Sequence, residues 1–212
     1  MPRSPRARAT ILAAASRVVR DRGAAALTFE EVVAASGVTR GGITYHFPTK
    51  DHLLRALVER DREDWERTLA AHRAACACGP EPDLVAYIRS STQDDADHRR
   101  FVSGMLGAVA HDPGLLASCR DFYRAQVGAC RWTDAELRHL MLRMAADGLF
   151  WMETFGFLDL PSAARRRFVD LLESLAAAGS APDRAAAAAP ATRRIRKRTI
   201  KKSAASGKGR KP

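Results

Sequence analysis

Two short helical patterns joined by a glycine constrain the fold of this chain more than any other feature of its sequence. The first pattern begins at Thr28, whose hydroxyl can accept a hydrogen bond from a free amide at a helix start. Glu31 stands three residues later, the spacing of a capping box. Apolar residues follow at helical spacing until Gly37, where the chain must adopt left-handed backbone geometry that favours glycine. We therefore expect a helix that ends in a tight turn.

The second pattern predicts another short helix directly after the turn. Thr39 can cap it, Ile43 and Phe47 share one face, and Pro48 ends it. The residues on its other face are polar or very small: Arg40, Gly41, Gly42, Thr44, Tyr45 and His46. Two short helices joined in this way form a helix-turn-helix, a motif that places its second helix in the major groove of DNA.

The outward residues of the second helix suit contacts with bases and phosphates. Arg40 is the best base reader among them, because its guanidinium can bond guanine in a bidentate manner. Gly41 and Gly42 each cost about 1 kcal/mol relative to alanine in a helix, and close backbone approach to DNA could compensate. Lys50 begins the next helix, where free amides favour a phosphate. The predicted DNA contacts are Thr28, Thr39, Arg40, Gly41, Gly42, Thr44, Tyr45, His46 and Lys50.

Residues 6–60 resemble the DNA-binding domain of the TetR family of bacterial transcription repressors, most clearly at 28–54. The string TRGGITYHFPTKDHLL at 39–54 is similar to the signature of that family: a Thr or Ser cap, a Tyr, an aromatic–Phe pair and a Lys that opens the fourth helix. The resemblance implies a homodimer that binds a palindromic operator and a C-terminal half that binds a small inducer. The consecutive glycines are a departure, since family members more often carry one small residue there.

The remaining sequence predicts helices and no alternating β pattern, so the expected fold class is all-α. An N-terminal three-helix domain at 1–50 would precede a helical effector-binding and dimerisation domain at 51–179. We expect helices at 5–21, 50–75, 82–92, from an Asp97 cap to near His111, from Pro113 onward, from Asp134 onward and at 162–178.

The charge of the chain is concentrated at its C-terminal end. The formal net charge is +11, and residues 180–212 contain eleven Lys or Arg against one acid, Asp183. The preceding residues are therefore nearly neutral. Large apolar residues are almost absent from this tail, which predicts disorder. Its clustered cations could tether the protein to DNA through counterion release, or could serve solubility alone.

Several classes of protein are not indicated by the sequence. No run of about eighteen apolar residues occurs and the N-terminus lacks a secretory signal, so we expect a cytoplasmic protein without membrane contact. His72, Cys76 and Cys78 could offer metal ligands, but a fourth ligand is missing. Motifs of nucleophilic, phosphate-binding or zinc catalysis are absent. We therefore predict no metal, no cofactor and no enzymatic activity.

The last two predicted helices suit a dimer interface. The helix that begins at Asp134 is apolar on two sides and needs two partners, so it could join the 162–178 helix in a four-helix bundle between subunits. An ordinary internal helix pair is the alternative. The predicted interface residues are Met141, Met144, Gly148, Phe168, Leu172 and Leu175.

Aromatic residues mixed with sparse polar groups suggest a small-molecule pocket in the second domain, although helical cores use the same residue types. Asp147 lies between apolar neighbours and could face a ligand, or it could pair with Arg143 on the surface. The predicted pocket residues are Phe101, Met105, Tyr123, Asp147 and Trp151.

These observations favour a repressor that a small-molecule effector releases from a palindromic operator. The alternative is a nucleoid-associated protein whose basic tail binds DNA with little sequence preference. Deletion of the tail would discriminate between the two.

Overall fold

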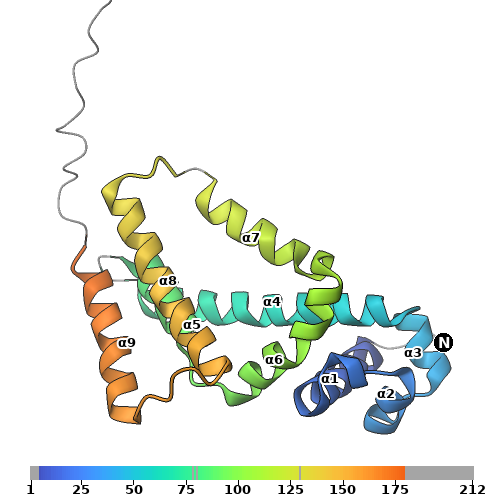
Figure 1. The fold of residues 1–212 in the computed structure, drawn as a ribbon. Coiled ribbons are helices and arrows are strands. Elements are labelled where there is room, and N and C mark those ends of the chain that lie inside the picture. The colour runs from blue at the N-terminus through green and yellow to red at the C-terminus, as the bar shows by residue number, and fades with distance from the viewer. Residues whose placement is uncertain (1–4, 78, 80, 129, 180–212) are drawn as a thin grey trace, which may run out of the picture.

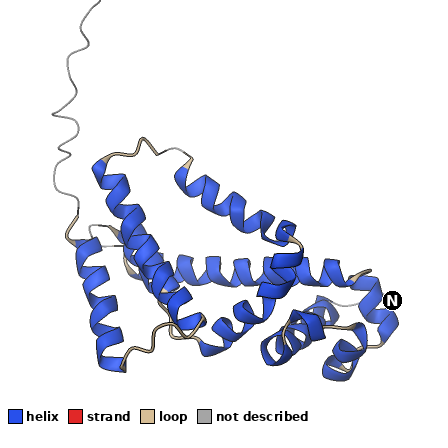
Figure 2. Cartoon of the chain, viewed as in Figure 1, coloured by secondary structure: helices blue, strands red, loops and turns tan. Residues whose placement is uncertain are grey.

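The computed structural model describes residues 5–77, 79, 81–128 and 130–179, and all regular secondary structure in these ranges is helical (Figures 1 and 2). The predicted all-α fold is confirmed. The predicted tail at 180–212 lies outside the described residues. The elements are α1 (Pro5–Arg22), η1 (Ala24–Ala26), α2 (Phe29–Ser36), α3 (Arg40–His46), α4 (Lys50–Ala75), α5 (Pro82–Ser91), α6 (Ala96–His111), η2 (Pro113–Leu116), α7 (Ala117–Val127), α8 (Asp134–Thr154) and α9 (Ser162–Ala177).

Local capping fixes the helix-turn-helix as the sequence predicts. The Thr28 hydroxyl accepts a hydrogen bond from the Glu31 amide at 3.2 Å, and Gly37 ends α2 in left-handed geometry with a φ of 69°. Thr39 accepts from the Gly42 amide at 3.2 Å and starts α3. One half of the predicted capping box is wrong, because the Glu31 carboxylate pairs with Arg22 of α1 instead of returning to Thr28.

One hydrophobic core holds the helix-turn-helix to the rest of the protein. Its fully buried side chains include Ile11 of α1, Ile43 of α3 and Leu57 of α4. Burying one such side chain contributes roughly 1.5–3 kcal/mol. Phe101 and Met105 of α6 belong to the same core. The predicted domain boundary at residue 50 therefore lies inside a continuous core.

Helix α6 approaches the backbone of α1 closely at Gly104. A Cβ atom built at this position would lie 2.3 Å from the Val19 carbonyl oxygen, a distance that real Cβ atoms essentially never show. Only glycine permits this approach without a backbone shift. The contact seats the second domain directly on the first helix of the DNA-binding domain (Figure 1).

A second core joins α5, α8 and α9. Leu84 and Ile88 of α5 pack with Leu142 of α8 and with Leu172 of α9. Leu172 is 5% exposed. The prediction that Leu172 lies in the dimer interface is therefore wrong, because its side chain faces α5 and α8 of its own subunit.

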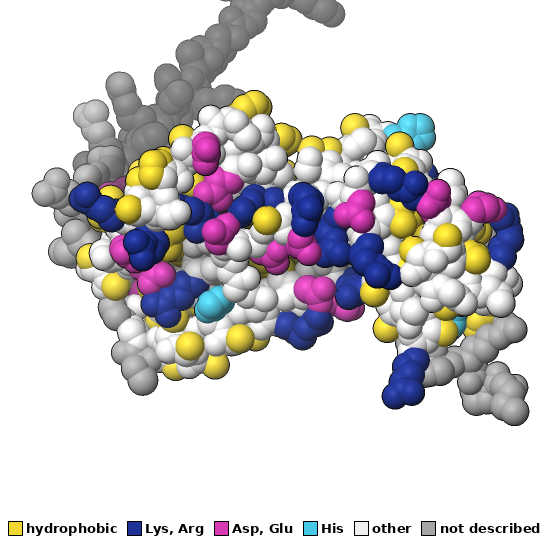
Figure 3. Space-filling model, turned by 90° about the horizontal axis from the view of Figure 1, so that it is seen from below, with side chains coloured by type: hydrophobic (Ala, Val, Ile, Leu, Met, Phe, Trp, Pro, Cys, Tyr) yellow, Lys and Arg dark blue, Asp and Glu magenta, His cyan; other side chains and the backbone are white. Residues whose placement is uncertain are grey.

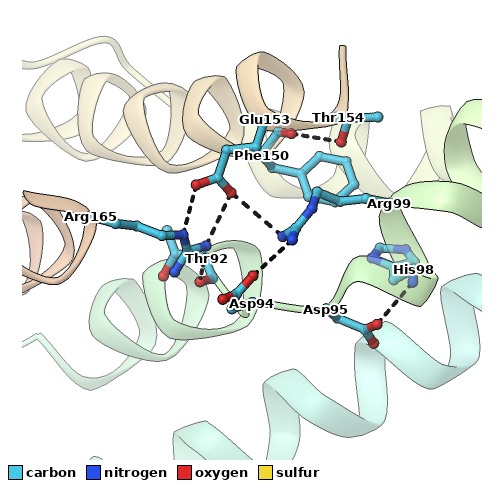
Figure 4. Close-up of polar contacts among 9 residues, drawn as sticks. All are labelled: Thr92, Asp94, Asp95, His98, Arg99, Phe150, Glu153, Thr154 and Arg165. Atoms are coloured by element: carbon cyan, nitrogen blue, oxygen red, sulfur yellow. Dashed lines mark hydrogen bonds and ion pairs between the residues drawn. The ribbon is translucent and has the colours of Figure 1, made fainter. Parts of the chain in front are cut away.

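A network of ion pairs ties α6, α8 and α9 together (Figure 4). Glu153 near the end of α8 accepts a hydrogen bond from Arg165 Nε of α9 at 2.7 Å and lies 3.6 Å from Arg99 Nη1 of α6. Arg99 also pairs with Asp94 at 2.8 Å. Bidentate and shared contacts of this kind fix orientation as well as adding attraction.

Two helix starts differ from the prediction. Asp95, rather than Asp97, caps α6 and accepts from the His98 amide at 2.9 Å, while Asp97 pairs with arginines. The segment after Pro113 begins as the short 3-10 helix η2, and α7 starts at Ala117. These differences arise because several acids and turn residues compete within a few positions.

Candidate nucleic-acid interface

Helix α3 presents most of the predicted DNA contacts to solvent. Arg40, Gly41 and Thr44 are exposed, and Tyr45 is 65% exposed. The built Cβ of Gly41 meets no atom within 4 Å, so no packing contact in the described chain requires a glycine there. This surface can approach a partner closely.

Gly42 does not belong to that surface. It is buried, and a Cβ built on it would lie 2.9 Å from Val38 Cγ1. The absence of a side chain at Gly42 therefore makes room for Val38 in the core. The structure corrects the prediction that Gly42 contacts DNA, because Gly42 is buried. The sequence alone could not separate Gly41 from Gly42, because both fit a close approach.

Arg40 is held by α2 in the free protein. Its guanidinium pairs with Glu30 and lies 5.9 Å from the centre of the Phe29 ring. Both charged side chains are about two-thirds exposed, and exposed pairs of this kind contribute only about 0–1 kcal/mol. Arg40 can therefore leave Glu30 for a base edge at small cost.

The start of α4 offers a second contact surface. The Thr49 hydroxyl accepts from the His52 amide at 3.3 Å, and Lys50 Nζ donates to the Ala25 carbonyl oxygen at 3.4 Å. Lys50 and Thr28 are exposed, whereas His46 is half-buried beside Tyr45. The exposed ammonium of Lys50 at a helix N-terminus suits a phosphate.

On one face of the described helices, basic and acidic side chains are interleaved (Figure 3). Figure 3 shows Lys and Arg interleaved with Asp and Glu over the face seen from below. This pattern agrees with the nearly neutral charge of the residues before 180. This face is therefore mixed in charge rather than uniformly basic (Figure 3), which favours selective contacts by α3.

Comparison with known proteins identifies the family from both halves of the chain. Residues 11–57 match the sequence model of bacterial regulatory proteins of the tetR family, and residues 84–177 match a tetracyclin repressor-like C-terminal domain. The chain belongs to the TetR family. The resemblance seen in the sequence is confirmed. Because TetR-family proteins are regulators, the prediction that the chain is not an enzyme is also confirmed.

Individual relatives agree with this assignment. The chain is 40% identical over 114 residues to the HTH-type transcriptional regulator CymR of Pseudomonas putida. The matched region covers 50% of this chain and 52% of that protein. The match thus spans about half the length of this curated relative. The structure of multidrug binding protein EbrR complexed with imidazole is 26% identical, with a TM-score of 0.60 and coverage of 86% of this chain and 95% of that one.

A TetR-family member from Streptomyces coelicolor shares the fold. Its identity is 24%, its TM-score 0.62, and the match covers 81% of this chain and 98% of that chain.

Within the ranges that the structure describes, no helix is long and apolar enough to cross a membrane. In the same ranges, His, Cys, Asp and Glu form no group of three that could hold a metal ion.

The structure brings two of the five residues predicted to line an effector pocket, Tyr123 and Asp147, near the same tyrosine, Tyr87, and places the other three elsewhere. Phe101 and Met105 lie in the core against α1, Tyr123 is half exposed on α7, and Trp151 stacks on Phe155. Asp147 accepts hydrogen bonds from Tyr87. A cavity of about 420 Å³ lies elsewhere, between the end of α4, α5 and α9, and its lining contains none of the predicted pocket residues.

The sequence missed several residues around Tyr87, the hydrogen-bond partner of Asp147. Trp65 of α4, Phe122 of α7 and Arg143 of α8 meet near Tyr87, although they are far apart in the chain. Only Arg143 carried a local signal, because it precedes Asp147 by one helical turn. Arg143 and Asp147 do not form the surface ion pair that this spacing allows, because the Arg143 guanidinium lies over the Tyr87 ring.

Proposed function

We propose that this TetR-family protein is a transcriptional regulator that binds a palindromic operator as a homodimer and is released by a small molecule. The single observation that carries the proposal is the capped, exposed α3, which presents Arg40, Gly41, Thr44 and Tyr45 together. A helix of this kind reads bases in the major groove, and two copies read two half-sites.

Exposed apolar residues on α8 and α9 support the homodimer. Met141 is 70% and Met144 63% exposed, and Leu171 on α9 is 58% exposed. Gly148 meets nothing within 4 Å of a built Cβ, so a partner helix can approach there. Contiguous apolar surface of this kind marks an interaction site, and a second copy would complete a four-helix bundle. Phe168 and Leu175 remain predicted members of that interface.

Helix α4 supports release by a ligand. It extends from the helix-turn-helix into the second domain, and its first turns lie in the core shared with α6 (Figure 1). A ligand that binds between the helices of the second domain can therefore change the position of α3. It shifts DNA binding only if it prefers the conformation that does not fit the operator. EbrR, which has been crystallised with imidazole and with ethidium, is a relative that binds small molecules.

Footprinting on genomic fragments bound by the full chain tests the proposal. We expect a symmetric protected site, and Arg40→Ala should weaken binding to it by about 1–3 kcal/mol while leaving the oligomeric state unchanged. Arg67→Ala is the control, since it removes the same charge from an exposed position on α4. Asymmetric protection, or equal affinity of Arg40→Ala and Arg67→Ala, would contradict the proposal.

The basic tail supports a second candidate, a nucleoid-associated protein. Eleven Lys or Arg in residues 180–212 favour nonspecific binding to DNA. Removal of these residues should lower the salt dependence of binding under both proposals. A regulator will still distinguish its operator from random DNA after the deletion, whereas a nucleoid-associated protein will lose most of its affinity for both.

A further inference from the structure

Side chains from four helices gather around Tyr87, which hydrogen bonds to a half-buried carboxylate in the second domain. The Tyr87 hydroxyl of α5 donates to both oxygens of Asp147 on α8, at 3.0 and 2.8 Å. The Trp65 ring of α4 lies edge-on to Tyr87, with centroids 5.6 Å apart, and lies 5.2 Å from Phe122 of α7. Tyr123 continues the aromatic wall at 5.5 Å from Phe122. We call these residues the aromatic–carboxylate cluster.

Asp147 has no ion-pair partner among the described residues. Seventeen ion pairs occur there, and none of them includes this carboxylate. Burial raises the pKa of the Asp147 carboxyl above its ordinary value, and the hydrogen bonds from Tyr87 and Ser91 together with the charge of Arg143 oppose that effect only in part. An organic cation can stabilise a partly buried carboxylate of this kind by pairing with it, while the apolar part of the cation packs against the surrounding side chains.

Arg143 shows that a cation fits in the cluster. Its guanidinium carbon lies 4.8 Å from the centre of the Tyr87 ring, within the range of a cation–π contact. Its Nη1 donates to Gln126 of α7 at 3.1 Å. Its Nε is buried without a hydrogen-bond partner in the described part of the chain. Arg143 is thus incompletely satisfied and can be displaced.

Helix α7 is the loosest cover of this cluster. None of its residues, Ala117–Val127, is buried, although Phe122 contributes a ring to the aromatic wall. The contact between Arg143 and Gln126 joins α7 to α8. Loss of that contact would free α7 to move away from α8.

We propose that the aromatic–carboxylate cluster binds an organic cation, an amine or quaternary ammonium on a flat apolar body. The positive group takes the place of the Arg143 guanidinium over Tyr87 and pairs with Asp147, while Trp65 and Phe122 contact the apolar body. Displacement of Arg143 then breaks the link to Gln126. This inference rests on the proposed function, because it names the chemical class of the effector. A neutral molecule that displaced Arg143 would leave the carboxylate without a nearby cation, and an anion would be repelled by it.

Binding of ethidium, a flat aromatic cation, to the full chain tests the inference by fluorescence titration. Phenanthridine, its neutral parent ring system, and anilinonaphthalene sulfonate, an aromatic anion, are the comparison probes. We expect ethidium to bind with the highest affinity, phenanthridine with a lower affinity and the anion with the lowest. Asp147→Asn should weaken ethidium binding by at least about tenfold, because one partner of a charge pair is lost. It should leave phenanthridine binding unchanged.

Matched variants separate charge from folding. Asp121→Asn removes the same charge from an exposed site on α7 and should leave ethidium affinity unchanged within about twofold. Arg143→Gln removes the competing cation and should strengthen ethidium binding. This variant tests the inference even if Asp147→Asn fails to fold. The inference would be overturned if the three probes bound with equal affinity or if the anion bound most tightly. It would also be overturned if neither Asp147→Asn nor Arg143→Gln changed the affinity for ethidium. Operator footprinting is measured separately, so a symmetric footprint with no cation preference would refute only this inference.

Discussion

Gly104 and Gly107 lie on the same helix, yet the structure gives them opposite roles. Gly104 allows α6 to touch the α1 backbone, whereas a Cβ at Gly107 would meet no atom within 4 Å. Glycine in the middle of a helix costs roughly 0.5–1 kcal/mol relative to alanine. Packing compensates that cost at Gly104, and nothing in the described chain compensates it at Gly107.

Alanine at these two positions should therefore change stability in opposite directions. Gly104→Ala must push α6 away from Val19 and should lower the free energy of unfolding by about 1–3 kcal/mol. Gly107→Ala should raise it by roughly 0.5–1 kcal/mol, because only helix propensity changes. Urea unfolding measures both. Equal stability of the two variants would show that α6 does not press on α1 as the structure places it.

At the scale of elements, α4 and α6 are joined by a titratable pair. His98 Nε2 of α6 lies 3.2 Å from Asp61 Oδ1 of α4, and the His98 ring also contacts Phe150 of α8. Burial lowers the pKa of His98, but the hydrogen bond and the charge of Asp61 outweigh it and raise the pKa above the ordinary value of 6.5. The protonated imidazole is thus favoured in the folded protein.

This pair should make stability depend on pH in a defined direction. Because the folded-state pKa of His98 is raised, the stabilisation is complete below pH 6.5 and is lost as the pH rises through the folded pKa. The free energy of unfolding of the wild type should therefore exceed that of His98→Gln by more at pH 6 than at pH 8.5. Asp61→Asn should reduce that pH dependence. A difference between wild type and His98→Gln that is the same at both pH values would rule out this ion pair.

At the scale of the whole molecule, one subunit leaves much of its apolar surface uncovered. Helices α8 and α9, which carry exposed methionines and leucines, lie at the end of the molecule away from the helix-turn-helix (Figure 1). A subunit with this surface exposed is prone to association. Reading two half-sites also requires two linked α3 helices, so dimerisation and operator recognition depend on each other.

A charge placed in the proposed interface should separate the subunits. Met144→Glu buries a carboxylate against apolar partners, a change expected to cost several kcal/mol of dimer stability. Sedimentation equilibrium should then report a monomer, and footprints should lose their symmetry. Ala110→Glu adds the same charge to an exposed position on α6 and should leave the dimer intact. A dimeric Met144→Glu variant would place the interface elsewhere.

The amino-acid sequence by itself determined the features that depend on neighbours in the chain. The caps at Thr28 and Thr39, the left-handed turn at Gly37 and the extent of α4 follow from contacts within about four residues, which a linear pattern records. The helix-turn-helix and its exposed Arg40 could therefore be predicted before any coordinates were known.

Only the tertiary structure decided which equivalent residues face which partner. It placed Gly42 in the core and left Gly41 outside, buried Leu172 within its own subunit, and brought Tyr87 to Asp147 across sixty positions of sequence. Helical periodicity gives each residue a face but not the helix that covers that face, because the covering helix is set by how all the side chains pack together. The candidate effector site consists of such contacts, which is why the sequence indicated Asp147 and Tyr123 but not Trp65 and Phe122, the other rings of that site.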